Sequence, residues 1–202
     1  MSKARDLANF GDDISDGVIS AALDGDGSAL TGLSAGATEV VSSGTASDVA
    51  SIEFTNLDLT TYDYKIVLRG LKSHYSYGQL YLNASVDNLS TLRGFNYQDI
   101  DGSGAWTDQT VINATDITVH YNHSSFFELN VSFQPSSFSY SKNVMQSAWI
   151  GFDRTNAFKN KFKNYIEPPT NIDGAALNSI RLYMSSGNIT ANKYTLYRTV
   201  KS

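Results

Sequence analysis

The chain of 202 residues contains no cysteine, which excludes disulfide frameworks, cysteine-ligated metal sites and cysteine nucleophiles. No apolar run approaches the roughly 18 residues of a membrane-spanning helix, and the first residues carry no apolar segment typical of a secretory signal. The chain has only 15 basic residues against 20 acidic ones, which argues against a general nucleic-acid binder. Its 12 Tyr, 10 Phe and 2 Trp are too many aromatic residues for a disordered chain.

The aromatic residues are concentrated in the later part of the chain, because only Phe10 precedes Phe54. Residues 1–45 are rich in Gly, Ser, Ala and Asp, and cannot bury enough apolar surface to offset an ordering cost of about 1–2 kcal/mol per residue. We therefore expect an N-terminal docking arm over residues 1–45, held by partner proteins, and a folded domain over residues 46–202. The large apolar residues of this arm are its candidate partner contacts: Leu7, Phe10, Ile14, Val18, Leu30 and Leu33.

The two ends of the chain differ in charge. The residues from Tyr140 onward carry a formal charge of +6, whereas those before it carry −11. This asymmetry suits protomers that pack against copies of themselves or against neighbouring proteins. The alternative is a solvated surface whose charges are simply unevenly distributed.

Alternation of apolar and polar residues recurs after Ala50 and predicts β-strands. The clearest case places Phe127, Leu129, Val131 and Phe133 on one face of a strand. Gly, Asn, Asp and Ser separate about eight such runs, which predicts an all-β, jelly-roll-like two-sheet sandwich. Residues 155–166 are the exception, because Phe158 and Phe162 lie four apart and favour a short helix, although the alternating lysines also fit a strand.

Several short motifs could carry chemistry, but each lacks part of its pattern. The G-x-S-x-G run at 32–36 has no preceding buried strand, so a turn is the better interpretation than a nucleophile elbow. Residues 99–104 begin like a calcium loop, but Thr110 stands where the bidentate Glu is needed, and residues 24–28 are followed by Ala29 where such a loop needs Gly. His120 and His123 have no cysteine to complete a zinc site. We therefore expect no catalytic residues, no metal site and no cofactor.

Aromatic residues in polar loops are candidate binding residues. Trp106 lies in a loop rich in Gly and Asp, and Tyr75 and Tyr77 flank Ser76 in another. Such residues can stack on sugar rings beside polar hydrogen-bonding groups, and they can equally serve subunit interfaces. We favour the interface, because the arm already requires partners, and keep carbohydrate binding as the alternative. Trp149, on an alternating strand, is predicted to be a core residue.

Four segments resemble structural and tail-fibre proteins of tailed bacteriophages, particularly those of marine phages. Residues 2–11 look like their N-terminal start. The run Gly25–Leu33, GDGSALTGL, is similar to an element of phage fibre chains. Residues 63–71 and 180–197 resemble the first and last parts of their jelly-roll domains. The order of these segments is more specific than any one of them.

This resemblance implies a non-enzymatic virion protein, often trimeric, anchored by its N-terminus. Because only about 45 residues precede the domain, a short fibre, head spike or decoration subunit fits better than a long fibre. The expected partners are other virion proteins and copies of this chain, as a homotrimer, with no nucleic acid and no membrane. The alternative function is a head that recognises carbohydrate on the host surface.

Overall fold

The computed structural model describes residues 14–15, 18–19, 37–74, 76–99, 110–115, 118–134, 142–166 and 175–201. The chain divides into two units, Met1–Gly32 and Leu33–Ser202. The described part of the first unit consists of two short strands, β1 (Ile14–Ser15) and β2 (Val18–Ile19), which pair antiparallel.

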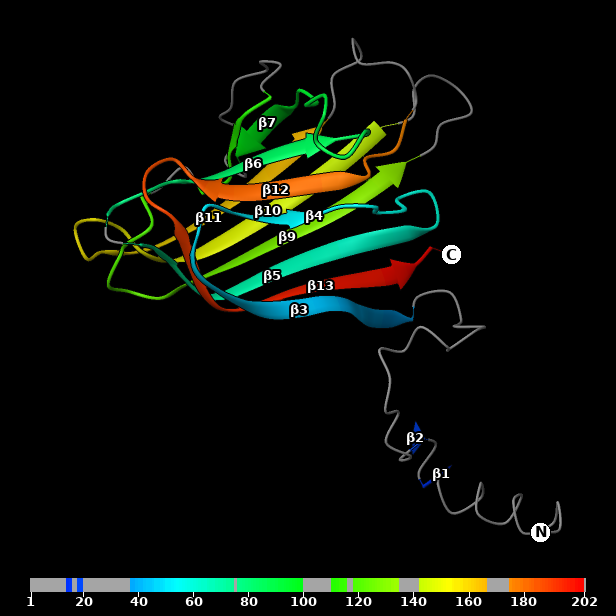
Figure 1. Ribbon diagram of the computed structural model, residues 1–202, viewed down its shortest axis with the longest axis horizontal. Coiled ribbons are helices and arrows are strands. Elements are labelled where there is room, and N and C mark those ends of the chain that lie inside the picture. Colours follow the sequence, from blue (N-terminus) through cyan, green and yellow to red (C-terminus); the bar gives the residue numbers. More distant parts are fainter. Residues whose placement is uncertain are drawn as a thin grey trace, which may run out of the picture. The chain divides into compact units, whose positions relative to one another are not determined.

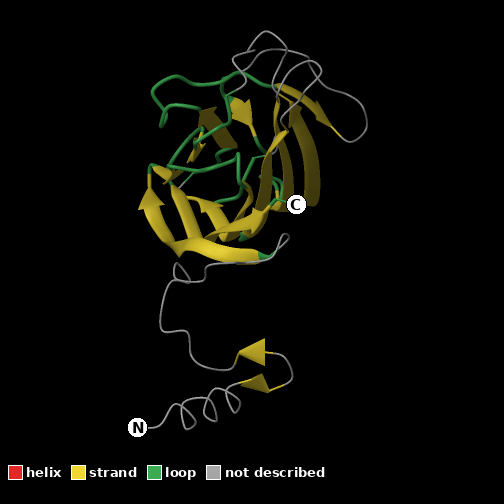
Figure 2. Cartoon of the chain, turned by 90° about the vertical axis from the view of Figure 1, so that its right-hand side faces the viewer, coloured by secondary structure: helices red, strands yellow, loops and turns green. Residues whose placement is uncertain are grey.

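The second unit is built from the remaining strands (Figure 1). In chain order these are β3 (Thr38–Val49), β4 (Ser51–Phe54), β5 (Tyr62–Ser73), β6 (Leu80–Ser85), β7 (Asn96–Asp99), β8 (Ile112–Asn113), β9 (Ser125–Gln134), β10 (Lys142–Phe152), β11 (Phe158–Ile166), β12 (Ser179–Met184) and β13 (Ile189–Val200). No helix occurs in the described ranges, and hence none that could cross a membrane (Figure 2).

The described strands of this unit form two antiparallel sheets. The large sheet has the order β3-β13-β5-β9-β10-β11-β7, and the small sheet has the order β4-β12-β6-β8. Four strands in each sheet follow the strand order of a jelly roll. They are β3-β13-β5-β9 in the large sheet and β4-β12-β6-β8 in the small sheet, and the chain passes back and forth between the two sheets as it does in that fold. Strands β10, β11 and β7 then extend the large sheet beyond β9. The predicted all-β, jelly-roll-like two-sheet sandwich is therefore confirmed.

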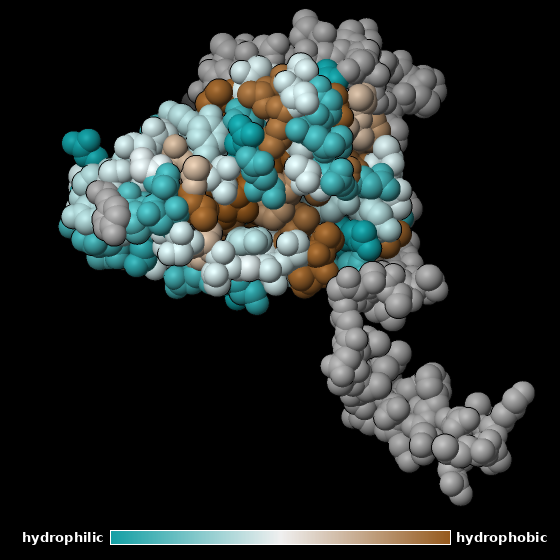
Figure 3. Space-filling view, viewed as in Figure 1, coloured by the Kyte–Doolittle hydropathy of each residue, from teal (hydrophilic) through white to brown (hydrophobic). Residues whose placement is uncertain are grey.

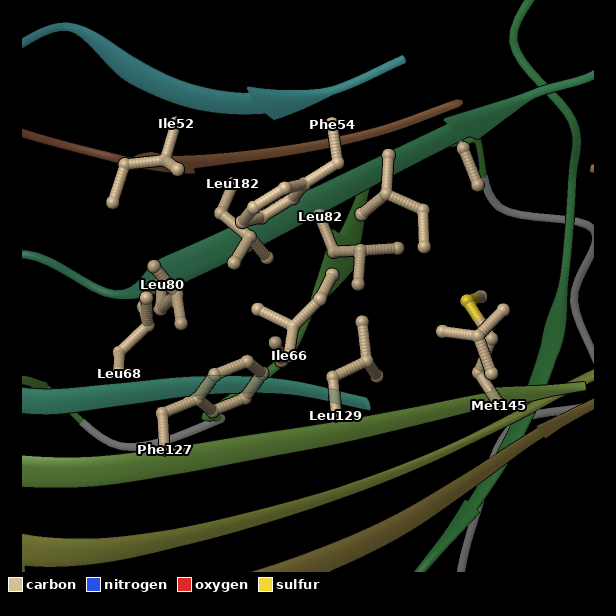
Figure 4. Packing of buried hydrophobic residues seen from close by; sticks show 14 of the residues in the cluster. Ile52, Phe54, Ile66, Leu68, Leu80, Leu82, Phe127, Leu129, Met145 and Leu182 are labelled. Atoms are coloured by element: carbon tan, nitrogen blue, oxygen red, sulfur yellow. The ribbon is translucent and has the colours of Figure 1, made fainter. Parts of the chain in front are cut away.

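The core lies between the inner faces of the two sheets. Figure 4 shows Ile66 and Phe127 of the large sheet pointing toward Leu82 and Leu182 of the small sheet, and all four are fully buried. Figure 3 shows a band of hydrophobic residues between β4 and the strands β3 and β13, flanked by more polar surface. Burial of the apolar side chains between the two sheets is the main favourable contribution to folding.

The alternation seen in the sequence correctly identifies which residues face this core. Phe127, Leu129, Val131 and Phe133 of β9 are all buried, as predicted. Trp149 of β10 is also fully buried, opposite Phe127 on the neighbouring strand. A period of two places these side chains on one face because successive residues of a strand point to opposite sides of the sheet.

The helix favoured for residues 155–166 is wrong, because Phe158–Ile166 forms strand β11. Strand β11 pairs with β10 from the Phe152–Phe158 pair to the Val144–Ile166 pair, so its backbone groups are satisfied within a long hairpin. Helical spacing of a few aromatic residues cannot outweigh a complete ladder of backbone hydrogen bonds.

The faces of β11 are also the reverse of the helical expectation. Phe158 and Phe162 lie on the outer face and are exposed, whereas Lys163 points inward and is only 2% exposed. The Lys163 Nζ donates a hydrogen bond to the backbone oxygen of Asn113, at 3.1 Å. A buried ammonium needs such partners to offset its desolvation.

The first strand of the sandwich begins before the expected domain boundary at residue 46. Strand β3 starts at Thr38 and pairs with β13, with Thr38 opposite Thr199. Ala46 is its one residue in the buried core, because β3 is an edge strand held by backbone pairing and by the Arg198–Glu39 ion pair. A strand that buries so little lacks the alternating large apolar residues by which sequence reasoning finds strands.

Candidate functional site

The residues proposed as binding sites from the sequence are only partly described. Trp106, Tyr75 and the apolar arm residues Leu7, Phe10, Leu30 and Leu33 lie outside the described residues, as do the motifs at 24–28 and 32–36. Ile14 and Val18 lie in β1 and β2, where Ile14 is opposite Ile19 and Val18 is opposite Ser15. Tyr77 follows β5 in a loop, and its side chain is 40% exposed.

Tyr77 belongs to a continuous chain of aromatic rings, which we call the aromatic end. It comprises Tyr77, His120, Tyr121, His123, Phe152 and Phe158. The Tyr77 ring meets the rings of His120 and Tyr121 edge-on, each with a centroid distance of 5.1 Å. Next in line, the His120 and His123 centroids are 4.5 Å apart.

The chain of rings then passes from the loops onto the β10–β11 hairpin. The His123 and Phe152 centroids are 5.0 Å apart, and those of Phe152 and Phe158 are 5.6 Å apart. Phe152 and Phe158 are also directly opposite each other in the sheet. Edge-to-face pairs of this kind stabilise an aromatic cluster beyond the burial of its area. The tertiary structure thus joins three separate segments into one aromatic surface.

A short, well-bonded turn holds Phe152 and Phe158 in position. An Asp153 carboxylate oxygen accepts hydrogen bonds from the backbone nitrogens of Thr155 and Ala157, at 2.8 and 3.0 Å, and from the Thr155 hydroxyl at 2.6 Å. Asn156 has a positive φ of 61°, a conformation that Asn adopts more readily than most residues. The hydrogen bonds lower the pKa of the Asp153 carboxyl, chiefly that from the Thr155 side chain. The turn is therefore ordered by the chain itself, without a partner.

The outer face of this hairpin carries exposed apolar side chains. Phe158 is 65% exposed and Phe162 is 40% exposed on β11. Ile150 of β10, also exposed, is opposite Asn160, which lies between these two phenylalanines on the same face. Single exposed apolar residues are normal, but contiguous ones mark interaction surfaces.

Of the residues in the aromatic end, the sequence indicates only Tyr77 as a binding residue. The sequence favours a helix with Phe158 on its inner face, and it leaves His120 and His123 as an incomplete metal site. The signal available in the sequence was the alternation of Lys159, Lys161 and Lys163, which fits a strand with its phenylalanines on the opposite face. No sequence pattern indicates that the start of this strand belongs to the same chain of rings as Tyr77.

His120 is the buried titratable group of the aromatic end. Its Nδ1 accepts a hydrogen bond from the backbone nitrogen of Asn122, at 2.9 Å, which requires the unprotonated form of that nitrogen. Burial lowers the pKa of His120, as does the neighbouring His123, while Asn156 and Asp153 act weakly in the opposite direction. The folded protein therefore favours neutral His120.

We expect this histidine to make stability depend on pH. The unfolded chain takes up a proton near the ordinary pKa of about 6.5, whereas folded His120 does so at lower pH. The contribution of His120 to the free energy of unfolding is therefore complete above about pH 6.5 and is lost as the pH falls below this value. Urea denaturation at a series of pH values should show that the free energy of unfolding decreases less steeply with falling pH in His120→Gln than in the unsubstituted chain. Identical slopes for the two proteins would contradict this assignment.

The described residues contain no cluster of three or more His, Asp or Glu side chains that could hold a metal ion. No protein-family model matches the chain, and the searches of curated proteins and of solved structures found no match either. Two exposed surfaces among the described residues are candidate interaction sites: the aromatic end, which is apolar, and a polar groove on the large sheet.

Proposed function

We propose that the chain is a non-enzymatic structural protein of a tailed-bacteriophage virion: a short fibre, head spike or decoration subunit. In this proposal the part of the N-terminal arm that precedes β3 docks to the particle. The sandwich packs through the aromatic end against neighbouring subunits, including copies of itself. The jelly-roll strand order agrees with this proposal, although the same fold serves many functions.

The observation that carries the proposal is the exposure of Phe158 on a preformed hairpin. The turn at Asp153 is fixed by its own hydrogen bonds, so little additional ordering is needed when Phe158 is buried by a partner. Large aromatic residues at the centre of a contact commonly dominate its binding energy. Ile150 would enlarge the same contact, because it lies on the same face of the hairpin.

The arm supports the proposal on sequence grounds. Residues 1–45 combine a formal charge of −5 with few apolar residues, which is typical of a segment that is ordered by its partners. The segments at 2–11 and 25–33 carry the resemblance to phage structural proteins.

The proposal predicts self-association that depends on Phe158. Burial of one Phe side chain contributes about 1.5–3 kcal/mol, so Phe158→Ser should raise the dissociation constant by about 10- to 100-fold. Light scattering coupled to size-exclusion chromatography of the full chain, over a range of concentrations, measures this shift toward smaller mass.

Val111→Ser provides the control, because Val111 is exposed but lies outside the aromatic end. This variant should keep the mass of the unsubstituted protein. If the unsubstituted chain is monomeric at every concentration, or if Phe158→Ser assembles like Val111→Ser, the aromatic end is not the contact between subunits.

A further inference from the structure

The outer face of the large sheet carries a second surface, which is polar. Two adjoining hollows, of about 410 and 420 Å³, lie over the middle strands of this sheet and share Asn130 and Gln146 in their linings. We call them together the polar groove. Their size is in the range of pockets that bind small molecules. The small sheet packs on the opposite face of the large sheet, so it does not cover the groove.

The register of the sheet aligns hydrogen-bonding side chains across the groove. Asn130 is opposite Lys65 on one side and Gln146 on the other, and Gln146 is opposite Asn164. These residues therefore form one row across β5, β9, β10 and β11. Neighbouring strands are about 4.8 Å apart, so the row repeats its polar groups at a regular interval.

The row offers donors and acceptors together rather than charge of one sign. Each amide side chain provides an acceptor oxygen and two donor hydrogens. No partner occurs among the described residues for the side-chain amides of Gln146 and Asn164, whereas the Asn130 amide donates to Glu128 at 3.0 Å. Free amides at a regular spacing suit a ligand that carries hydroxyl groups along its length.

The charged groups of the groove are already engaged within the protein. Asp63 forms an ion pair with Lys201, at 3.5 Å, and Lys65 lies over the ring of Tyr197, with its Nζ 5.7 Å from the centroid. Glu128 accepts the hydrogen bond from Asn130. The groove therefore has no unpaired cluster of one sign to select a charged ligand.

Apolar surface lies at one end of the row, where Phe162 lies in the wall of the second hollow. Ala148 lies between Glu128 and Phe162 on the neighbouring strands, and its small side chain leaves room beside the Phe162 ring. Aromatic surface next to amides is the combination that binds sugar rings, which have apolar faces and polar edges.

We infer that the polar groove binds a neutral oligosaccharide that lies across the strands of the large sheet. Its hydroxyl groups hydrogen-bond to Asn130, Gln146 and Asn164, and one sugar ring contacts Phe162. This inference gives the sandwich a ligand site formed by residues other than Trp106, Tyr75 and Tyr77. It does not depend on the assembly role proposed above.

An array of neutral and acidic oligosaccharides of equal length, probed with the full chain, tests the inference. Neutral members are expected to bind. Gln146→Ala combined with Asn164→Ala should weaken that binding by about tenfold or more, as expected for two lost hydrogen bonds. Ala148→Phe should abolish it by filling the second hollow. Asn192→Ala, at an exposed amide of β13 outside the groove, should bind like the unsubstituted chain.

Thermal denaturation of each variant separates loss of binding from loss of folding, and light scattering separates it from loss of assembly. The inference is overturned if no neutral oligosaccharide binds, if only acidic ones bind, or if the double variant binds as well as Asn192→Ala. It is also overturned if the groove variants dissociate the oligomer, because the groove would then be covered by a second copy. Each of these outcomes leaves the Phe158 test of assembly to be judged separately.

Discussion

Phe127→Ala is expected to lower the free energy of unfolding by about 3–5 kcal/mol, a large part of the stability of an ordinary domain. Phe127 of β9 is fully buried beside Leu68 of β5 (Figure 4). On its other side it is opposite Trp149 of β10. Removal of its ring leaves a cavity that these rigid neighbours cannot fill, because strands on both sides fix their backbones. Urea denaturation followed by tryptophan fluorescence measures the change.

The neighbouring residue provides a matched control. Phe126 is the same residue type on the same strand, but it points to the outer face, opposite Arg69 and Ile150, and is only half-buried. Phe126→Ala should therefore cost less than half as much as Phe127→Ala, since it loses less apolar burial and leaves no enclosed cavity. Equal costs for the two substitutions would show that the inner and outer faces of β9 are wrongly assigned.

The second large effect concerns docking of the arm. Leu30 and Leu33 are closely spaced large apolar residues in a segment that has few others. If partners order the arm, burial of these two leucines contributes about 3–6 kcal/mol before ordering costs. Leu30→Asp combined with Leu33→Asp should therefore abolish incorporation into particles, which is measured by quantifying the chain in purified virions.

The control for this double variant is the stability of the sandwich. The melting temperature of the full chain should not change, because both residues precede β3, the first strand of the sandwich. Particles that incorporate the double variant at the normal level would establish the alternative, namely that the arm is a spacer whose side chains make no essential contact.

The buried faces of the long strands were predictable from residue order alone. Phe127, Leu129 and Val131 alternate with polar residues, and a strand of any register must place such residues on one face. The same reasoning correctly assigned Trp149 to the core. These predictions succeed because a long, strongly alternating segment can bury its apolar residues in only one way.

Segments with weak or mixed patterns were not predictable in the same way. Strand β3 buries few of its own side chains and depends on pairing with β13. Its residues 38–45 therefore resemble the arm in sequence. The spacing of Phe158 and Phe162 fits a helix as well as a strand, and pairing with β10 decided between them. Only long-range backbone hydrogen bonds distinguish these alternatives, and residue order does not encode them locally.

The all-β class, the inward residues of the main strands and the contrast between residues 1–45 and the remainder follow from composition and alternation. Both candidate binding surfaces depend on the tertiary structure. The aromatic end joins Tyr77, His123 and Phe158 from three separate segments, and the polar groove requires the register that aligns Asn130 with Gln146. The preference for burial is a property of each side chain by itself, and it therefore leaves a pattern along the sequence. Contacts between distant strands arise only when the sheets form, because strand order and register are set by the packing of the whole sandwich.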